Sequence, residues 1–292
     1  MFELNSGKWS LAAAPECGGN LARAAWQGID IMRPFETMEQ WQNTPTNFGF
    51  AVLFPPNRID NGKFTFQGKE YFLPVNEPAR CNHLHGIALR EKWTCTECAG
   101  NKIAMELIFD QNSPMYEGYP FDCSLRVEYT VNEDELTQRF EVENHSAIPI
   151  PCALGFHSAF VIPERMKVYG SGKKIELLPP RYLATGNEVD WEDDFAPSKW
   201  CDPVKTWPFG HLRATESPLA ELDYNGYLVS YMPDPEFKYW MVWRPVDDTS
   251  FICIEPMNMR IGTFETAPDL LPITQPGETS SFISRIKIKK NQ

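Results

Sequence analysis

Short segments in which hydrophobic and polar residues alternate recur along most of the chain, whereas segments with a helical period are scarce. Alternation sends successive side chains to opposite faces of an extended strand, so it predicts half-buried β-strands. The turn signals between the segments are typical of an antiparallel sandwich or barrel rather than of βαβ units. The clearest predicted strands are residues 102–109, 124–131, 136–145, 227–233, 239–245, 250–256 and 281–290.

Turns and loops can be predicted from the same pattern. Asn61-Gly62 and Gln67-Gly68 each separate segments rich in aromatic and β-branched residues, and this pattern predicts two successive hairpins. Residues 38–48 could form a short helix. The stretch 187–210 is polar and acidic and contains three tryptophans, and it is predicted to be a long loop of the kind that often lines a site.

The overall composition limits the function classes. No repeat, low-complexity tract or flexible linker divides the 292 residues, so the expectation is one large β domain over residues 1–292. The net charge of −12 opposes binding to nucleic acids or anionic membranes, and a neutral small molecule fits better. No apolar run is long enough to span a bilayer, and no signal peptide is visible, so a cytoplasmic location is expected.

Eight cysteines at irregular spacings, without an export signal, are expected to be reduced thiols rather than four disulfides. Cys95 and Cys98 form a lone C-x-x-C motif. Without a second cysteine pair or a nearby ligand cluster, this motif is a weak signal for zinc or redox chemistry.

The stretch Cys-Asn-His-Leu-His-Gly, residues 81–86, holds two of the five histidines in the chain. If this stretch is extended, His83 and His85 project to the same side. That geometry suits a metal ion, a buried structural pair or a polar pocket. A catalytic metal usually needs a third protein ligand, and no carboxylate and histidine signature stands nearby, so no metal is predicted.

Three further residues are candidates for chemistry. His157 lies in an apolar segment, where a hydrogen-bonded core histidine is the ordinary interpretation. Glu255 ends the apolar strand candidate 250–256, and a carboxylate there indicates either a structural ion pair or a site. A Glu and a His together can remove one proton and deliver another. Arg58 could hold ligand oxygens with its forked donors, although an exposed arginine is usually solvated surface.

Taken in order along the chain, these segments resemble the aldose 1-epimerase (mutarotase) family of the galactose-mutarotase-like superfamily. The resemblance rests on residues 18–34, on Asn57-Arg58 with the following Gly-Lys-Phe, on the Asn-His-Leu-His-Gly motif, on Gly-Phe-His-Ser at 155–158, on Cys-Ile-Glu-Pro at 253–256, and on the closing segment 271–288. Individually the motifs are weak, but their shared order is specific.

The resemblance implies an all-β fold, a large antiparallel β-sandwich with few short helices and a site on its concave face. It implies that His157 protonates the ring oxygen of an aldose, that Glu255 removes the anomeric proton, and that Arg58 and His85 bind the sugar. No cofactor is required for this chemistry. A non-catalytic sugar-binding protein and a hexose-phosphate 1-epimerase stay open as alternatives, and so does the oligomeric state, a homodimer included.

The chain departs from the family pattern at three places. Ile87 replaces the second glycine after the motif histidine, and Ser158-Ala159 replaces a Pro-Tyr pair. The substrate-binding aspartate of the family would align near Gly210, so it is missing or displaced, with Asp202 or an acid of the 187–210 stretch as replacements. The identity of the sugar therefore stays open.

Overall fold

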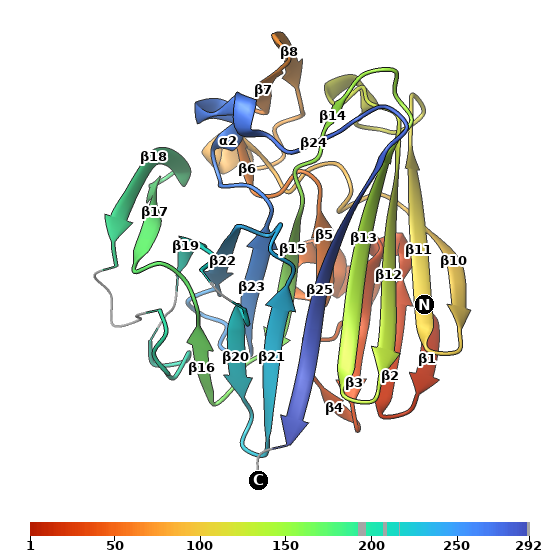
Figure 1. Cartoon of the computed structure of the whole chain (residues 1–292), viewed down its shortest axis with the longest axis vertical. Coiled ribbons are helices and arrows are strands. Elements are labelled where there is room, and N and C mark those ends of the chain that lie inside the picture. Colours follow the sequence, from red (N-terminus) through yellow and green to blue (C-terminus); the bar gives the residue numbers. More distant parts are fainter. Residues whose placement is uncertain (192–196, 207–208, 216, 291–292) are drawn as a thin grey trace.

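Two large antiparallel sheets dominate the computed structural model, which describes residues 1–191, 197–206, 209–215 and 217–290 (Figure 1). The eight-stranded sheet has the order β10 (Thr94–Ala99), β11 (Lys102–Phe109), β12 (Cys123–Asn132), β13 (Glu135–Asn144), β25 (Thr279–Lys290), β21 (Tyr227–Pro233), β20 (Ala220–Asp223) and β16 (Arg165–Val168). The seven-stranded sheet has the order β18 (Leu183–Asp190), β17 (Lys173–Leu178), β19 (Gly210–Arg213), β22 (Tyr239–Trp243), β23 (Phe251–Met257), β15 (Gly155–Val161) and β5 (Phe50–Leu53).

Smaller elements surround these sheets. A four-stranded sheet contains β1 (Phe2–Ser6), β2 (Trp9–Ala14), β3 (Asn20–Trp26) and β4 (Ile29–Asp30). Two-stranded pairs join β6 (Arg58–Asp60) to β9 (Asn82–Leu84), β7 (Lys63–Phe66) to β8 (Lys69–Phe72), and β14 (Ile150–Pro151) to β24 (Ile273–Thr274). Figure 1 shows β6, β7, β8 and the helix α2 (Thr263–Thr266) gathered at one end of the molecule.

Helices are few and short. They are α1 (Met38–Asn43), α2, and the 3-10 turns Pro15–Cys17, Pro45–Asn47, Pro78–Arg80, Tyr116–Gly118 and Pro268–Leu270. Thr37 caps α1, because its hydroxyl accepts a hydrogen bond from the Gln40 amide while the Gln40 side chain accepts one from the Thr37 amide. None of the helices in the described ranges has the length and apolar character that crossing a membrane requires.

The core follows from strand alternation. In β12, Leu125, Val127, Tyr129 and Val131 are buried, while the three residues that alternate with them are partly exposed. Strands β15 and β23 are buried on both faces, apart from Val161 at the end of β15, and each lies between two other strands of its sheet. One large hydrophobic cluster contains residues from both large sheets. The prediction of an all-β antiparallel sandwich is therefore confirmed.

Most predicted strands coincide with observed strands to within a few residues, and the helix predicted at 38–48 is present as α1 and the following 3-10 turn. One hairpin prediction is wrong. Gln67-Gly68 joins the paired strands β7 and β8, but Asn61-Gly62 only links β6 to β7, because β6 pairs with β9 instead. The asparagine and glycine still form a turn, with φ of 51° and 69°.

The prediction of one long loop over 187–210 is also wrong in part. Residues 187–190 belong to strand β18, which pairs with β17, and Gly210 begins β19. Residues 192–196 and 207–208 of the stretch lie outside the described residues.

Candidate active site

The two candidate acid-base residues face each other across adjacent strands. The register that pairs Gly155 with Met257 and Ser158 with Ile254 sets His157 of β15 opposite Glu255 of β23. Their side chains meet, with His157 Nε2 at 3.2 Å from Glu255 Oε1. Both are buried, at 4% and 3% side-chain exposure. Residues directly opposite in an antiparallel pair are close enough for such contact.

The backbone ladder is interrupted at this place. Pro256 has no amide hydrogen, and the regular pairing of β15 with β23 passes over Phe156 and His157. Alternation keeps the neighbouring positions out of the site. Ser158 points to the opposite face, where its hydroxyl lies 2.9 Å from the Tyr231 hydroxyl of the other large sheet.

Burial controls the protonation of this pair. It raises the pKa of Glu255 from 4.5 to about 8, and the charge of Arg58 opposes this rise. Burial also lowers the pKa of His157 from 6.5 to about 3, against a smaller opposing effect from the Thr46 backbone. The pair therefore retains one proton across the neutral range, and desolvation favours the form in which both groups are neutral.

His85, which follows strand β9, lies beside this pair. Its ring lies nearly perpendicular to that of His157, with 5.4 Å between the ring centroids. Burial, together with the charges of His157 and Arg58, holds the pKa of His85 well below its usual value. Its φ of 68° places it in the left-handed region just after β9, and its amide donates to the Asn57 carbonyl at 3.0 Å.

The expectation that His83 and His85 share one side is wrong. His83 lies within β9 and is fully buried, and its Nδ1 is 2.7 Å from the Pro74 carbonyl. The left-handed turn at His85 breaks the alternation of the strand, so only His85 reaches the cavity. Gly86 fixes this turn, because a Cβ there would lie 2.1 Å from the Phe54 carbonyl oxygen.

Arg58 is held by a carboxylate rather than exposed to solvent. Its Nε and Nη2 each donate to one oxygen of Glu77 at 2.9 Å. Arg80 donates to the same carboxylate at 2.8 Å, and both guanidinium groups lie over the Tyr182 ring. Burial tends to raise the pKa of Glu77, but the hydrogen bonds and charges of Arg58, Asn82 and Arg80 outweigh it and lower the pKa.

One cavity of about 280 Å³ brings together all four sequence-predicted site residues, Arg58, His85, His157 and Glu255. Its size is near the lower end for small-molecule sites. Sequence reasoning missed the other lining residues, which are Thr46, Asn57, Arg80, Leu84, Tyr182, Phe209, Met241 and Trp243. Strand register could have identified one of them, since Met241 pairs with Glu255 and so shares its face.

The displaced aspartate has no replacement among the described residues that line the cavity, because Glu255 is their only carboxylate. Gly210 could not carry it, since a Cβ there would lie 2.3 Å from the Trp191 ring, and position 210 shares a face with the core residue Leu212. His211 is buried, and its Nε2 accepts a hydrogen bond from the Ile261 amide. Asp202 pairs with Lys205 and does not line the cavity.

All eight cysteines are free thiols, Cys95 and Cys98 included. Within the described ranges, His, Cys, Asp and Glu side chains form no group of three or more that could hold a metal ion.

Curated proteins share part of this sequence. The Escherichia coli protein YihR, described as uncharacterized, is 30% identical over 142 residues, which are 48% of this chain and 44% of YihR. Galactose mutarotase of Rattus norvegicus is 30% identical over 125 residues, which are 41% of this chain and 34% of that protein. The chain thus spans less than half the length of both curated relatives.

Solved structures extend the likeness over nearly the whole chain. A galactose mutarotase-like protein from Clostridium acetobutylicum superposes with a TM-score of 0.89 at 22% identity, covering 99% of this chain and 95% of that one. A putative aldose 1-epimerase from Escherichia coli K12 gives 0.84 at 19% identity, with 99% of both chains covered. At these identities the likeness shows the fold.

The sequence pattern of the family described as Aldose 1-epimerase matches residues 1–202, a segment that includes Arg58, His85 and His157. Glu255 lies beyond the matched residues, and the fold itself brings it to His157. The match covers more than half of the chain, and the chain therefore belongs to the aldose 1-epimerase family.

Proposed function

We propose that this protein is an aldose 1-epimerase, an isomerase that interconverts the α and β anomers of a free aldose. The observation that carries the proposal is the buried contact of 3.2 Å between Glu255 and His157 at the wall of a small cavity. Mutarotation needs one group that removes a proton and another that delivers one, and this pair holds one proton across the neutral range.

The proposed reaction begins with the ionised form of the pair. A proton passes from Glu255 to His157 across their contact, which leaves a carboxylate beside an imidazolium. The carboxylate then removes the hydroxyl proton at C1 of the sugar, the imidazolium protonates the ring oxygen, and the bond between C1 and that oxygen breaks. After rotation about the bond between C1 and C2, the open aldehyde closes again with the two proton transfers reversed.

The remaining lining residues have binding roles in this proposal. Arg58 and His85 hydrogen-bond sugar hydroxyls, since both lie beside the acid-base pair. Trp243 offers an aromatic surface next to His157, with 5.9 Å between the ring centroids. The substrate is a small molecule of monosaccharide size, in keeping with the cavity volume of about 280 Å³.

The test is the rate of anomer exchange of several aldoses, measured by polarimetry and by exchange NMR, with and without the protein. Glu255→Gln should abolish the acceleration. Glu106→Gln is the matched control, because it removes a carboxylate from β11 in the other large sheet. Aldose binding without any faster exchange would instead support a non-catalytic sugar-binding protein.

A second candidate substrate is a hexose phosphate, and one specific observation favours it. Two arginines, Arg58 and Arg80, line the cavity, and among the described residues neither Arg58 Nη1 nor Arg80 Nη2 has a hydrogen-bond partner. These groups could donate to a phosphate oxygen. Arg80→Gln should then lower kcat/KM for the phosphorylated hexose about tenfold and leave the free hexose nearly unchanged. Equal loss for both sugars would exclude a phosphate-specific role.

A further inference from the structure

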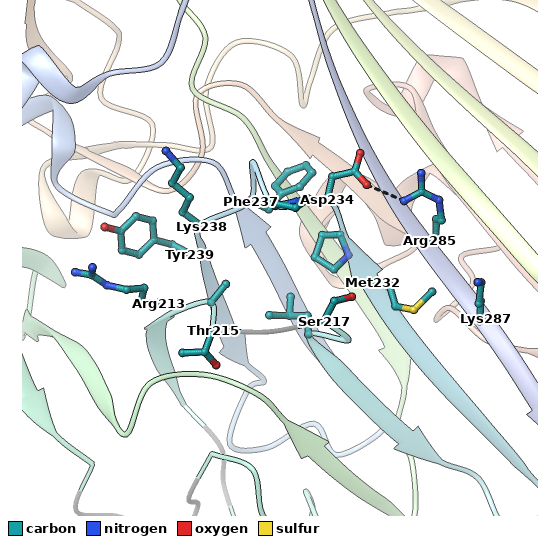
Figure 2. Close-up of a pocket in the computed structure, with 14 residues that line it drawn as sticks. Arg213, Thr215, Ser217, Met232, Asp234, Phe237, Lys238, Tyr239, Arg285 and Lys287 are labelled. Atoms are coloured by element: carbon teal, nitrogen blue, oxygen red, sulfur yellow. Dashed lines mark hydrogen bonds and ion pairs between the residues drawn. The ribbon is translucent and has the colours of Figure 1, made fainter.

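A second cavity, of about 710 Å³, lies outside the candidate active site. It is bordered by the ends of β21 and β22, by strand β25, and by the segments that follow β19 and β21. Figure 2 shows Arg213, Lys238 and Tyr239 on one side of it and Asp234, Arg285 and Lys287 on the other. No residue is shared between this lining and that of the active-site cavity.

The charge of this cavity is opposite to that of the whole protein. Four cationic side chains and one carboxylate line it, although the chain carries a net charge of −12. Lys238 is exposed and forms no ion pair with any described residue. The other three cations are paired: Arg213 with Glu188 at 2.6 Å, Arg285 with Asp234 at 2.7 Å, and Lys287 with Glu135 at 3.3 Å. Such partly exposed pairs contribute little stability, so a ligand anion can compete for these cations.

The walls of the cavity are already formed. The Ala214 amide donates to the Lys238 carbonyl at 2.8 Å, which ties the two bordering segments together, and the Asp234 amide donates to Ile283 of β25 at 2.8 Å. Apolar side chains such as the buried Phe237 form part of the lining. The Arg213 guanidinium lies 5.8 Å from the centre of the Tyr239 ring, so charge and a flat aromatic surface occur side by side.

We propose that this cavity is a second small-molecule site, which binds an organic phosphate. Lys238 and Arg213, which lie on the same side of the cavity, receive the phosphate dianion, and Tyr239 with the apolar wall receives the organic part. A phosphate monoester carries close to two negative charges and three acceptor oxygens at neutral pH. The volume lies within the usual range for small-molecule sites. Nucleoside phosphates and sugar phosphates share this chemistry.

The test is calorimetric titration of the full chain with AMP, ribose 5-phosphate, inorganic phosphate and adenosine. We expect saturable binding of at least one phosphate ester with a Kd below about 1 mM, weakened by added salt, and weaker binding of adenosine and inorganic phosphate. Tighter binding of AMP would indicate a nucleoside phosphate as the ligand, and tighter binding of ribose 5-phosphate would indicate a sugar phosphate. Lys238→Gln should raise the Kd of that ester about tenfold.

Lys92→Gln is the matched control, because Lys92 is exposed and lines a different cavity. The proposal is overturned if neither ester binds, if both lysine variants change the Kd equally, or if inorganic phosphate binds as tightly as the esters. It is also overturned if the ester binds equally well to Lys238→Gln but is lost in Arg80→Gln, because the ester then occupies the active-site cavity. Loss of mutarotase activity alone would not affect it.

Discussion

Replacing Glu255 with glutamine should make the protein more stable at neutral pH while removing the proposed epimerase activity. The reason is desolvation. Glu255 is buried, and its pKa is raised from 4.5 to about 8, so the folded protein binds a proton there that the unfolded chain has released. Stability therefore falls as the pH rises from 4.5 towards 8. Glutamine has nearly the same shape and carries no charge, so this loss disappears.

The magnitude follows from the raised pKa. At pH 7 the unfolded glutamate is about 2.5 pH units above its usual pKa of 4.5, and the folded one is still mostly protonated. At 1.36 kcal/mol for each unit, the gain in the free energy of unfolding is at most about 3 kcal/mol at pH 7. The gain should shrink to about 0.4 kcal/mol at pH 4.5, where the unfolded side chain is half protonated and the folded one is almost fully protonated.

Urea unfolding of wild type, Glu255→Gln and the control Glu106→Gln, measured at pH 4.5 and pH 7, gives the comparison directly. The control should show no such pH-dependent gain. If Glu255→Gln is less stable than wild type by several kcal/mol at pH 7, the reasoning is refuted. That result would mean that the pair is a buried ion pair, whose disruption leaves an uncompensated imidazolium.

Three further predictions concern activity. The value of kcat/KM should stay level between pH 5 and pH 7 and fall above about pH 8, because Glu255 then loses the one proton of the pair; a steep fall below pH 6 would contradict this. His157→Ala should lower turnover about 100-fold or more in polarimetry, whereas His85→Ala should mainly raise KM, and equal losses of turnover would undermine the division of roles. His83→Gln should keep near-normal kcat/KM but lower the free energy of unfolding by about 1 to 3 kcal/mol, because it disturbs the buried contact with the Pro74 carbonyl.

The strands could be predicted from the sequence because they depend on local pattern, whereas local pattern did not pair His157 with Glu255. Alternating burial gave the strands, and a carboxylate at the end of an apolar strand marked Glu255. The contact with His157 needed the register of β15 and β23, which the sequence does not specify. The order of motifs shared with the aldose 1-epimerase family supplied what alternation alone could not.

The other residues that line the cavity were harder to predict, because their positions depend on non-local contacts and on backbone conformation. His85 separates from His83 because its backbone is left-handed, and that turn is imposed by the approach of Gly86 to the Phe54 carbonyl. Arg80 is held at the cavity by hydrogen bonding to Glu77, the carboxylate that also accepts hydrogen bonds from Arg58. Nothing in the local pattern distinguishes such an arginine from one at the solvated surface.

The His157 and Glu255 pair and the turn residues that line the cavity are held in place in different ways. Ala51, His157, Glu255 and Met241 occupy one row across β5, β15, β23 and β22, so sheet register sets the separation of the acid-base pair. Arg80, His85 and Tyr182, in contrast, lie in turns between strands and are held by hydrogen bonds and ring contacts. If the proposed function is correct, substitutions in these turns should alter which sugar binds without moving Glu255 relative to His157. Under the proposed function, specificity can therefore diverge within this fold while the proton chemistry stays constant.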